Sequence, residues 1–155
     1  MSNIQALDWI LDFMESKNIP YLICGGLGAI AYGSTRPLND IDLYVPEEHY
    51  AEIVRFGRGY ISFGPERVHN ERWNVDYVQF IYKGKKIEVG SSDNIEIFVS
   101  KTQKWFHKKL NFKNYTLKRA FGRLIRVMTK EQLIEYKEML NREVDRIDIE
   151  QISIK

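Results

Sequence analysis

The sequence of 155 residues has few features of a small secreted protein or of a membrane protein. Its single cysteine, Cys24, excludes an internal disulfide framework and a zinc site made of several cysteines. No apolar run approaches the roughly 18 residues that a membrane-spanning helix requires. Acidic residues at Asp8, Asp12 and Glu15 near the start argue against a signal peptide. We therefore expect a cytoplasmic protein with no membrane segment.

Net charge is also small, at +2, and charged residues make up 28% of the chain against 44% hydrophobic residues. This balance argues against wholesale disorder. The length suits one domain spanning residues 1–155, with a core of its own.

One segment has no acidic residue at all: residues 101–126 contain nine lysines and arginines, interleaved with aromatic residues. Such a segment can bind nucleic acid, with cations on phosphates and rings under bases. It can equally attract a nucleoside triphosphate. The third interpretation is a solvated face whose aromatic residues point into the core.

The spacing of apolar residues predicts the regular elements. We expect helices over 4–17, 25–33, 46–56, 101–109, 129–142 and 145–152. We expect strands over 21–24, 41–45, 59–64, 74–82, 86–89, 95–99, 117–121 and 124–128. Residues 67–73 are expected to form a surface loop, and Thr129 with Gln132 a capping box. This order predicts an α+β fold, a mixed β-sheet flanked by helices.

Asp40 and Asp42 lie two residues apart on a predicted strand, so their carboxylates point to the same face. Two like charges about 4 Å apart repel by about 4 kcal/mol at an effective dielectric constant of 20. A divalent cation turns this repulsion into attraction, and carboxylate oxygens suit Mg²⁺. The pair therefore predicts a metal site.

Gly25 and Gly26, between a strand and a short helix, would let a triphosphate approach the backbone. Ser34, Thr35 and Arg36 follow and can donate hydrogen bonds to phosphate oxygens. With the paired aspartates, these residues predict a metal–triphosphate site. The alternative is a tight turn followed by a solvent-facing acidic pair. A dinucleotide site fits poorly, because no acid ends a second strand about 20 residues later.

Transfer of a nucleotidyl group to a hydroxyl calls for a third carboxylate. Glu88 is the best candidate, because it lies between Ile87 and Val89 on a predicted strand. Asp76 is the second candidate.

These residues resemble the signature of DNA polymerase beta-type nucleotidyltransferases: a glycine turn, an acid–apolar–acid strand and a third acid on a later strand. Here the signature reads Gly25–Gly26, Asp40–Ile41–Asp42 and Glu88. Residues 21–46 are especially similar to small bacterial lincosamide and aminoglycoside adenylyltransferases and to toxin–antitoxin-associated nucleotidyltransferases. Those proteins also tend to carry Thr-Arg before the acidic strand, as Thr35–Arg36 does here.

The resemblance implies a polymerase beta-like palm fold and a site with assigned roles. Asp40 and Asp42 would hold two Mg²⁺ ions, with Glu88 completing the metal that activates the acceptor. Gly25, Gly26, Thr35 and Ser34 would bind the β,γ-phosphates, and Arg36 would neutralise their charge. The substrate would be ATP or another NTP, attacked at its α-phosphorus with release of pyrophosphate. The hydroxyl acceptor would be a small molecule, a tRNA end or a protein.

The C-terminal part is similar to a Lys…Arg…Asp…Asp helical pattern in the same small proteins. By that resemblance Lys137 reaches the triphosphate, while Arg142 and Asp148 brace the last helices. An ordinary charged helix face is the alternative interpretation.

Two hypotheses follow. The first is an active Mg²⁺-dependent nucleotidyltransferase, whose short chain would leave the acceptor site to a second subunit, as in a homodimer, or would lack that site. The second is a non-catalytic protein of this fold that acts as a nucleotide-binding regulator or as a toxin–antitoxin-type partner. The direction of Glu88 separates them, because catalysis requires it to point toward Asp40 and Asp42.

Overall fold

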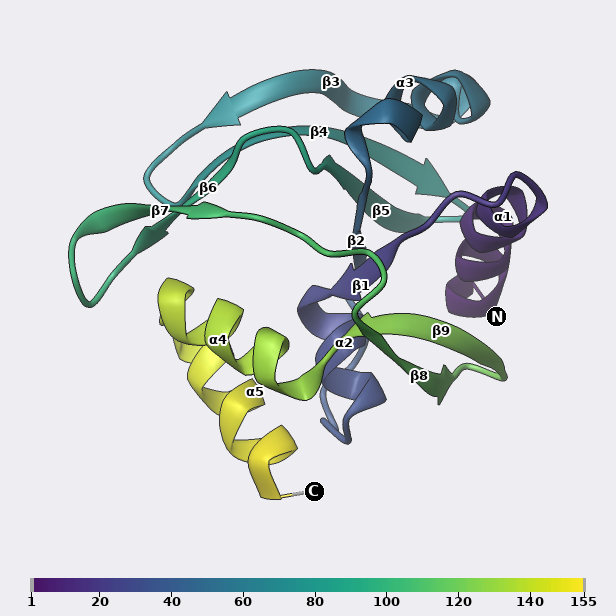
Figure 1. Ribbon diagram of the computed structural model, residues 1–155. Coiled ribbons are helices and arrows are strands. Elements are labelled where there is room, and N and C mark those ends of the chain that lie inside the picture. Colours follow the sequence, from purple (N-terminus) through teal and green to yellow (C-terminus); the bar gives the residue numbers. More distant parts are fainter. Residues whose placement is uncertain (1, 155) are drawn as a thin grey trace.

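The computed structural model describes residues 2–154, which form one mixed β-sheet and the helices around it (Figure 1). The strands are β1 (Leu22–Cys24), β2 (Asp40–Val45), β3 (Ile61–His69), β4 (Trp73–Tyr82), β5 (Lys85–Ser91), β6 (Ile95–Val99), β7 (Lys104–Lys108), β8 (Tyr115–Ala120) and β9 (Arg123–Met128). The helices are α1 (Ser2–Ser16), α2 (Gly25–Ala31), α3 (Glu47–Phe56), the 3-10 turn η1 (Arg58–Tyr60), α4 (Lys130–Leu140) and α5 (Glu143–Ile154). None of the helices in this part of the chain is long and apolar enough to cross a membrane.

The sheet runs in the order β7-β6-β4-β5-β2-β1-β9-β8, with β3 paired to β4. Strand β2 pairs with β5 in parallel and with β1 antiparallel, while β1 pairs with β9 in parallel. The strand that carries the paired aspartates therefore lies in the middle of the sheet, where neighbours on both sides restrict its position.

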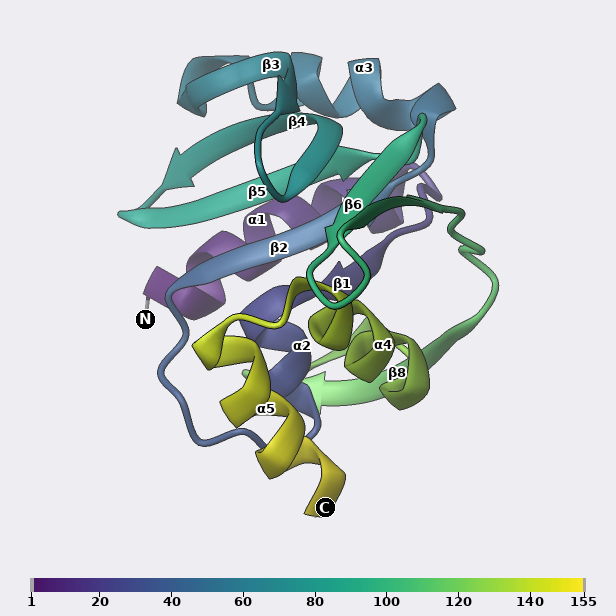
Figure 2. The ribbon, with the colours of Figure 1, turned by 90° about the vertical axis from the view of Figure 1, so that its left-hand side faces the viewer.

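The two faces of β2 differ in chemistry, as the period of two requires. Ile41, Leu43 and Val45 join the core cluster that α1 completes. Tyr44 points to the other face and belongs to the cluster formed with α4 and α5. Figures 1 and 2 show α1 and the pair α4–α5 on opposite sides of the central strands. The functional candidates on β2 thus face α4 and α5.

Most predicted elements are confirmed, including the hairpins β4–β5 and β8–β9. The capping box is present at the start of α4: Thr129 Oγ1 accepts from the Gln132 N–H at 3.2 Å, and Gln132 Oε1 accepts from the Thr129 N–H at 3.3 Å. Asn141 ends α4 in the left-handed conformation.

Two local predictions are wrong. The expected helix over 101–109 is replaced by a turn and strand β7, which pairs antiparallel with β6. Its aromatic residues Trp105 and Phe106 favour strand, and pairing with a sheet edge outweighs the weak helical preference. The expected loop over 67–73 is mostly hairpin, since β3 continues to His69 and β4 begins at Trp73. Only the tight turn between them remains irregular.

The basic segment 101–126 does not form one continuous strip. Its two ends lie at opposite edges of the sheet, because β7 and β8 are the outermost strands of the order. Within the segment Lys108 is buried, Arg123 pairs with acids of α1, and Arg126 stacks over the rings of Tyr21 and Tyr115. Several of the nine cations are thus part of the fold's internal packing.

Candidate active site

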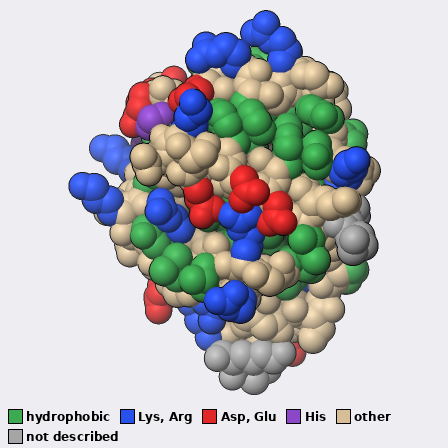
Figure 3. All heavy atoms as spheres, turned by 90° about the vertical axis from the view of Figure 1, so that its right-hand side faces the viewer, with side chains coloured by type: hydrophobic (Ala, Val, Ile, Leu, Met, Phe, Trp, Pro, Cys, Tyr) green, Lys and Arg blue, Asp and Glu red, His purple; other side chains and the backbone are tan. Residues whose placement is uncertain are grey.

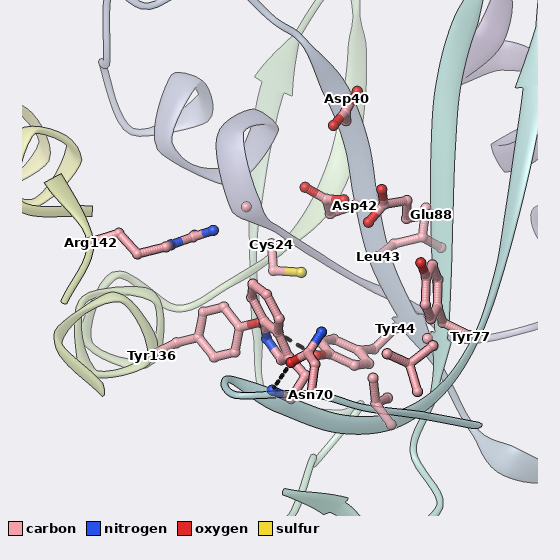
Figure 4. A pocket seen from close by; sticks show the side chains of 15 residues that line it. Cys24, Asp40, Asp42, Leu43, Tyr44, Asn70, Tyr77, Glu88, Tyr136 and Arg142 are labelled. Atoms are coloured by element: carbon pink, nitrogen blue, oxygen red, sulfur yellow. Dashed lines mark hydrogen bonds between the residues drawn. The ribbon is translucent and has the colours of Figure 1, made fainter. Parts of the chain in front are cut away.

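Two of the three predicted carboxylates meet in the centre of the sheet. In the parallel register of β2 and β5, Asp42 is the direct partner of Glu88, and Asp40 is the partner of Lys86. Figure 4 shows the carboxyl groups of Asp42 and Glu88 turned toward one another, with Asp40 further along the strand. Glu88 therefore points toward the aspartates, which is the orientation that the catalytic hypothesis requires.

The electrostatics of this group reflect like charges in a confined space. Burial, followed by the charges of Glu88 and Asp40, raises the pKa of Asp42 to about 8. Burial and the charge of Asp40 also raise the pKa of Glu88. Direct contact with the Glu88 side chain also raises the pKa of Asp42. Carboxylates held this close together are suited to binding a cation.

Gly25 follows β1 and packs against the acids. It has φ +60, and a Cβ at this position would overlap Oδ2 of Asp42. Glycine is thus required here twice: for the left-handed backbone and for the close approach of Asp42. The glycine turn and the acidic strand, predicted as one site, are in direct contact.

The other residues predicted to bind phosphate lie around the same turn, and each of them forms hydrogen bonds within the protein. Ser34 is buried, and its Oγ accepts from the Arg36 N–H at 3.3 Å. Thr35 exchanges hydrogen bonds with the side chain of Gln151 on α5. Arg36 donates from Nη1 to Oδ2 of Asp148 at 2.8 Å. A Cβ at Gly26 would lie 3.2 Å from Cζ of Arg36, so the guanidinium packs directly on the glycine turn.

Lys137 is buried beneath this site and does not reach the surface. Its Nζ donates to Oδ2 of Asp148 at 2.9 Å and lies 3.9 Å from Oδ1 of Asp145. Its positive charge nevertheless lowers the pKa of Asp42, against the larger effects that raise it. Asp145 in turn binds Arg142 through both oxygens. Lys137, with Asp148 and Asp145, therefore ties α4 to α5, while Arg142 and Asp145 pair across the turn that joins the two helices.

A cavity of about 400 Å³ opens beside the acids (Figure 4). It is lined by site residues already described and by further residues of β2, β3, β4, β5, α4 and the β3–β4 turn. These further lining residues are Leu43, Tyr44, Val68, Asn70, Trp73, Val75, Tyr77, Gly90 and Tyr136. Gly90 makes room for this wall, because a Cβ there would lie 2.7 Å from the ring of Tyr44.

The wall is aromatic and its polar atoms are largely paired with one another. Trp73 Nε1 donates to the hydroxyl of Tyr136 at 3.0 Å, and the hydroxyls of Tyr136 and Tyr44 lie 3.5 Å apart. The guanidinium of Arg142 stacks 5.3 Å from the Trp73 ring centre. Sequence reasoning missed this wall. Only Tyr44 carried a usable signal, since it is two residues beyond Asp42 and so shares its face.

Two other residues with reactive side chains, Asp76 and Cys24, have no catalytic role in the candidate site. Asp76 lies 3.7 Å from Arg67 on the far side of β4 from the cavity, so it is not the third acid. Burial raises the pKa of the Cys24 thiol, which suits a core residue rather than a nucleophile. Within residues 2–154, no group of three or more histidine, cysteine or carboxylate side chains lies close enough together to hold a metal ion by itself. Mg²⁺ is commonly bound by one or two carboxylates together with substrate phosphates, which suits a half-open site.

The fold is shared with solved nucleotidyltransferase structures. A protein from Thermotoga maritima, TM1012, described as a nucleotidyltransferase, matches over 98% of this chain and 92% of its own, with 20% identity and a TM-score of 0.75. The lincosamide antibiotic adenylyltransferase LnuA with bound lincomycin matches over 96% of this chain and 95% of its own, with 16% identity and a TM-score of 0.66. ANT(2'')-Ia in complex with adenylyl-2''-tobramycin matches over 99% of this chain and 89% of its own, with 15% identity and a TM-score of 0.67.

No curated protein matches the sequence significantly. The sequence model of the aminoglycoside-2''-adenylyltransferase family, however, matches residues 6–152, which extend from within α1 to within α5 and include every strand. The chain therefore belongs to the aminoglycoside-2''-adenylyltransferase family, whose members are nucleotidyltransferase enzymes.

Proposed function

We propose that this protein transfers the adenylyl group of ATP to a hydroxyl of a small-molecule acceptor, with Mg²⁺ as cofactor and release of pyrophosphate. ATP is the donor that membership of an adenylyltransferase family implies. The observation that carries the proposal is the pairing of Asp42 with Glu88 beside Gly25, at the edge of a cavity.

The donor set fits Mg²⁺, because it consists of carboxylate oxygens, and burial and mutual repulsion together raise the pKa of Asp42. Asp40, Asp42 and Glu88 would hold the metal on the face of the sheet that carries the cavity. When bound, Mg²⁺ supplies positive charge that stabilises the attacking and leaving oxygens of the displacement.

The protein's own groups position the two substrates. Gly25 and Gly26 let the carboxylate of Asp42 and the guanidinium of Arg36 approach the backbone of the turn, against which a triphosphate would bind. The acceptor oxygen attacks the α-phosphorus, the bond to the β-phosphate oxygen breaks, and pyrophosphate leaves. Glu88 is suited to accept the hydroxyl proton, because its pKa is raised toward neutral pH, where a general base works best. Positioning and electrostatics would supply most of the rate acceleration.

The cavity favours a small acceptor over a tRNA end or a protein. Its volume of about 400 Å³ lies within the range of small-molecule sites. Its wall of Tyr44, Trp73, Tyr77 and Tyr136 offers flat apolar surfaces, and Asn70 is a polar group at its far end. A fully formed wall within one chain also makes a second subunit unnecessary for the acceptor.

Calorimetric titration of ATP with and without Mg²⁺ tests the donor and metal part of the proposal. We expect Mg²⁺-dependent binding that is lost in the double variant Asp40→Asn/Asp42→Asn. The control is Asp12→Asn, an exposed acid of α1 outside the cavity, which should bind ATP as the wild type does. Failure of every nucleotide to bind would overturn the proposal and favour a non-catalytic scaffold or a toxin–antitoxin-type partner.

Pyrophosphate release with a panel of hydroxylated compounds tests the acceptor part. Lincomycin and tobramycin belong in this panel, because structures of similar proteins contain lincomycin or adenylyl-2''-tobramycin. Acceptor-dependent release that disappears in the same double variant would support adenylyl transfer. Binding of ATP without release in the presence of any small acceptor would contradict the small-molecule assignment.

A further inference from the structure

Two buried aspartates of α5, Asp145 and Asp148, are paired in different ways. Both oxygens of Asp145 bind Arg142: Nε donates to Oδ2 at 2.7 Å, and Nη2 donates to Oδ1 at 3.1 Å. Asp148 uses one oxygen for two cations, since its Oδ2 accepts from Arg36 at 2.8 Å and from Lys137 at 2.9 Å. Oδ1 of Asp148 is buried and has no hydrogen-bond partner among the described residues.

The pairing of Asp148 is not the one that best stabilises a fold. A bidentate pair of the Asp145 kind satisfies both carboxylate oxygens, whereas a buried acceptor without a partner lowers stability. Asp148 instead brings together two cations from separate parts of the chain, Arg36 in the segment before β2 and Lys137 on α4. Of these two cations, Arg36 packs on the glycine turn.

The contact with Asp148 fixes the Arg36 side chain but occupies only one nitrogen of its guanidinium, Nη1. Its side chain is 23% exposed, and its guanidinium lies against Gly26, where Cζ, Nη2 and Nε are the atoms nearest to an added Cβ. Nη1 is bound to Asp148, while Nε and Nη2 have no hydrogen-bond partner within residues 2–154. Two donors of a planar fork thus border the space where a triphosphate would lie, and such forks bind phosphate oxygens well.

We propose that Asp148 is a positioning residue for the triphosphate, holding Arg36 against the Gly25–Gly26 turn with Nε and Nη2 left to bind the β- and γ-phosphates. The same carboxylate also compensates the positive charge of Lys137, whose ammonium is buried. This inference rests on the proposed function, because it assigns the residue that orients the ATP-binding cation.

The test is calorimetry with MgATP and, separately, with AMP and Mg²⁺, on Asp148→Asn and Asp145→Asn. AMP lacks the β- and γ-phosphates, so a residue that acts on them changes ATP affinity alone. We expect Asp148→Asn to raise the Kd for MgATP about tenfold, as loss of a group that orients a ligand-binding residue commonly does. The Kd for AMP should stay within about twofold, a change too small to count as a lost interaction.

Asp145→Asn is the matched control, because it makes the same change at a buried aspartate of the same helix. It is expected to leave the ratio of the two Kd values unchanged. If it changes that ratio as much as Asp148→Asn does, the effect is a general loss of negative charge from α5 and the inference is wrong.

A double-mutant cycle with Arg36→Met separates positioning from a general structural effect. If Asp148 acts through Arg36, the variant Arg36→Met/Asp148→Asn binds MgATP no more weakly than Arg36→Met. Additive losses, with an equal loss of AMP affinity, would overturn the inference.

Arg36→Lys covers the case in which Asp148→Asn does not fold, since Arg36 is partly exposed. A lysine keeps the charge but has no fork that spans Asp148 and a phosphate, so we expect a loss selective for MgATP. Wild-type affinity in this variant would overturn the inference. A wild-type protein that binds no MgATP would instead reject the proposed function itself.

Discussion

Acidic side chains gather at two places in this molecule, on α1 and at the cavity, and only those on α1 have a paired cation. On α1, Asp8 and Asp12 lie 2.7 and 3.0 Å from Nη1 of Arg123 on β9, and Glu15 pairs with Nη2 of the same guanidinium. Figure 3 shows the face that carries α1, with acidic and basic side chains gathered at its centre. At the cavity, Asp40, Asp42 and Glu88 form no ion pair with any described residue.

The comparison separates a structural cluster from a functional one. The acids of α1 share a cation, Arg123, so folding alone offsets part of their charge. The cluster at the cavity has no paired cation, and burial together with the charges of the neighbouring acids raises the pKa of Asp42 and Glu88. Like charges held together without a partner lower stability and are typical of sites that bind a cation or transfer a proton. The missing cation therefore indicates that the ligand of the cavity cluster is a cation.

The largest expected effect is on catalysis. Asp42→Asn removes the central carboxylate of the cavity and should lower the rate of pyrophosphate release by at least about a hundredfold, as loss of a group that stabilises the transition state does. Asp12→Asn removes an acid from the other cluster and should leave the rate unchanged. The measurement is acceptor-dependent pyrophosphate release under saturating MgATP. A similar loss in both variants would abolish the distinction between the clusters.

The next effect is on stability. Arg123 is 18% exposed and is the common partner of the three acids of α1. Arg123→Met should lower the free energy of unfolding by about 2 kcal/mol, because it leaves those acids repelling one another. Asp12→Asn should cost less than about 1 kcal/mol, since Asp12 is 72% exposed and solvent screens its pair. Urea unfolding measures both, and equal losses would contradict the central role of Arg123.

The smallest effect has the opposite sign. Burial and the neighbouring acids raise the pKa of Asp42 from its ordinary value of 3.8 to about 8 in the folded protein, so the folded state binds more protons between these pH values. Its contribution to stability therefore falls as pH rises from about 4 to 8. We expect Asp42→Asn to be more stable than the metal-free wild type at pH 9 by at least about 1 kcal/mol. At pH 5 the gap should be smaller.

Thermal unfolding across this pH range checks the prediction, with and without Mg²⁺. Added Mg²⁺ should stabilise the wild type at pH 8 and have little effect on the variant, because ligands stabilise only the state that binds them. If the variant is less stable than the wild type at high pH, a cation of the protein itself compensates the cavity acids, as Arg123 does for the acids of α1.

Local sequence signals predicted most of the fold. The apolar spacing of α1, the turn residues of the hairpins and the capping box at Thr129 each determine structure within a few residues. The prediction over 101–109 failed because β7 is defined by its partner β6 and by little in its own spacing. The loop predicted over 67–73 failed for the same reason, since β3 and β4 extend by pairing with each other.

The candidate site divides along the same line. The sequence by itself determined that Asp40 and Asp42 share a face and that Gly25 can adopt a left-handed turn, because both depend on backbone geometry alone. Only the tertiary structure decided that Glu88 lies beside Asp42, that Asp148 holds Arg36, and that aromatic residues of β4 and α4 line the cavity. Each of these contacts joins residues far apart in the chain, and their positions depend on strand pairing and helix packing, which no local pattern encodes.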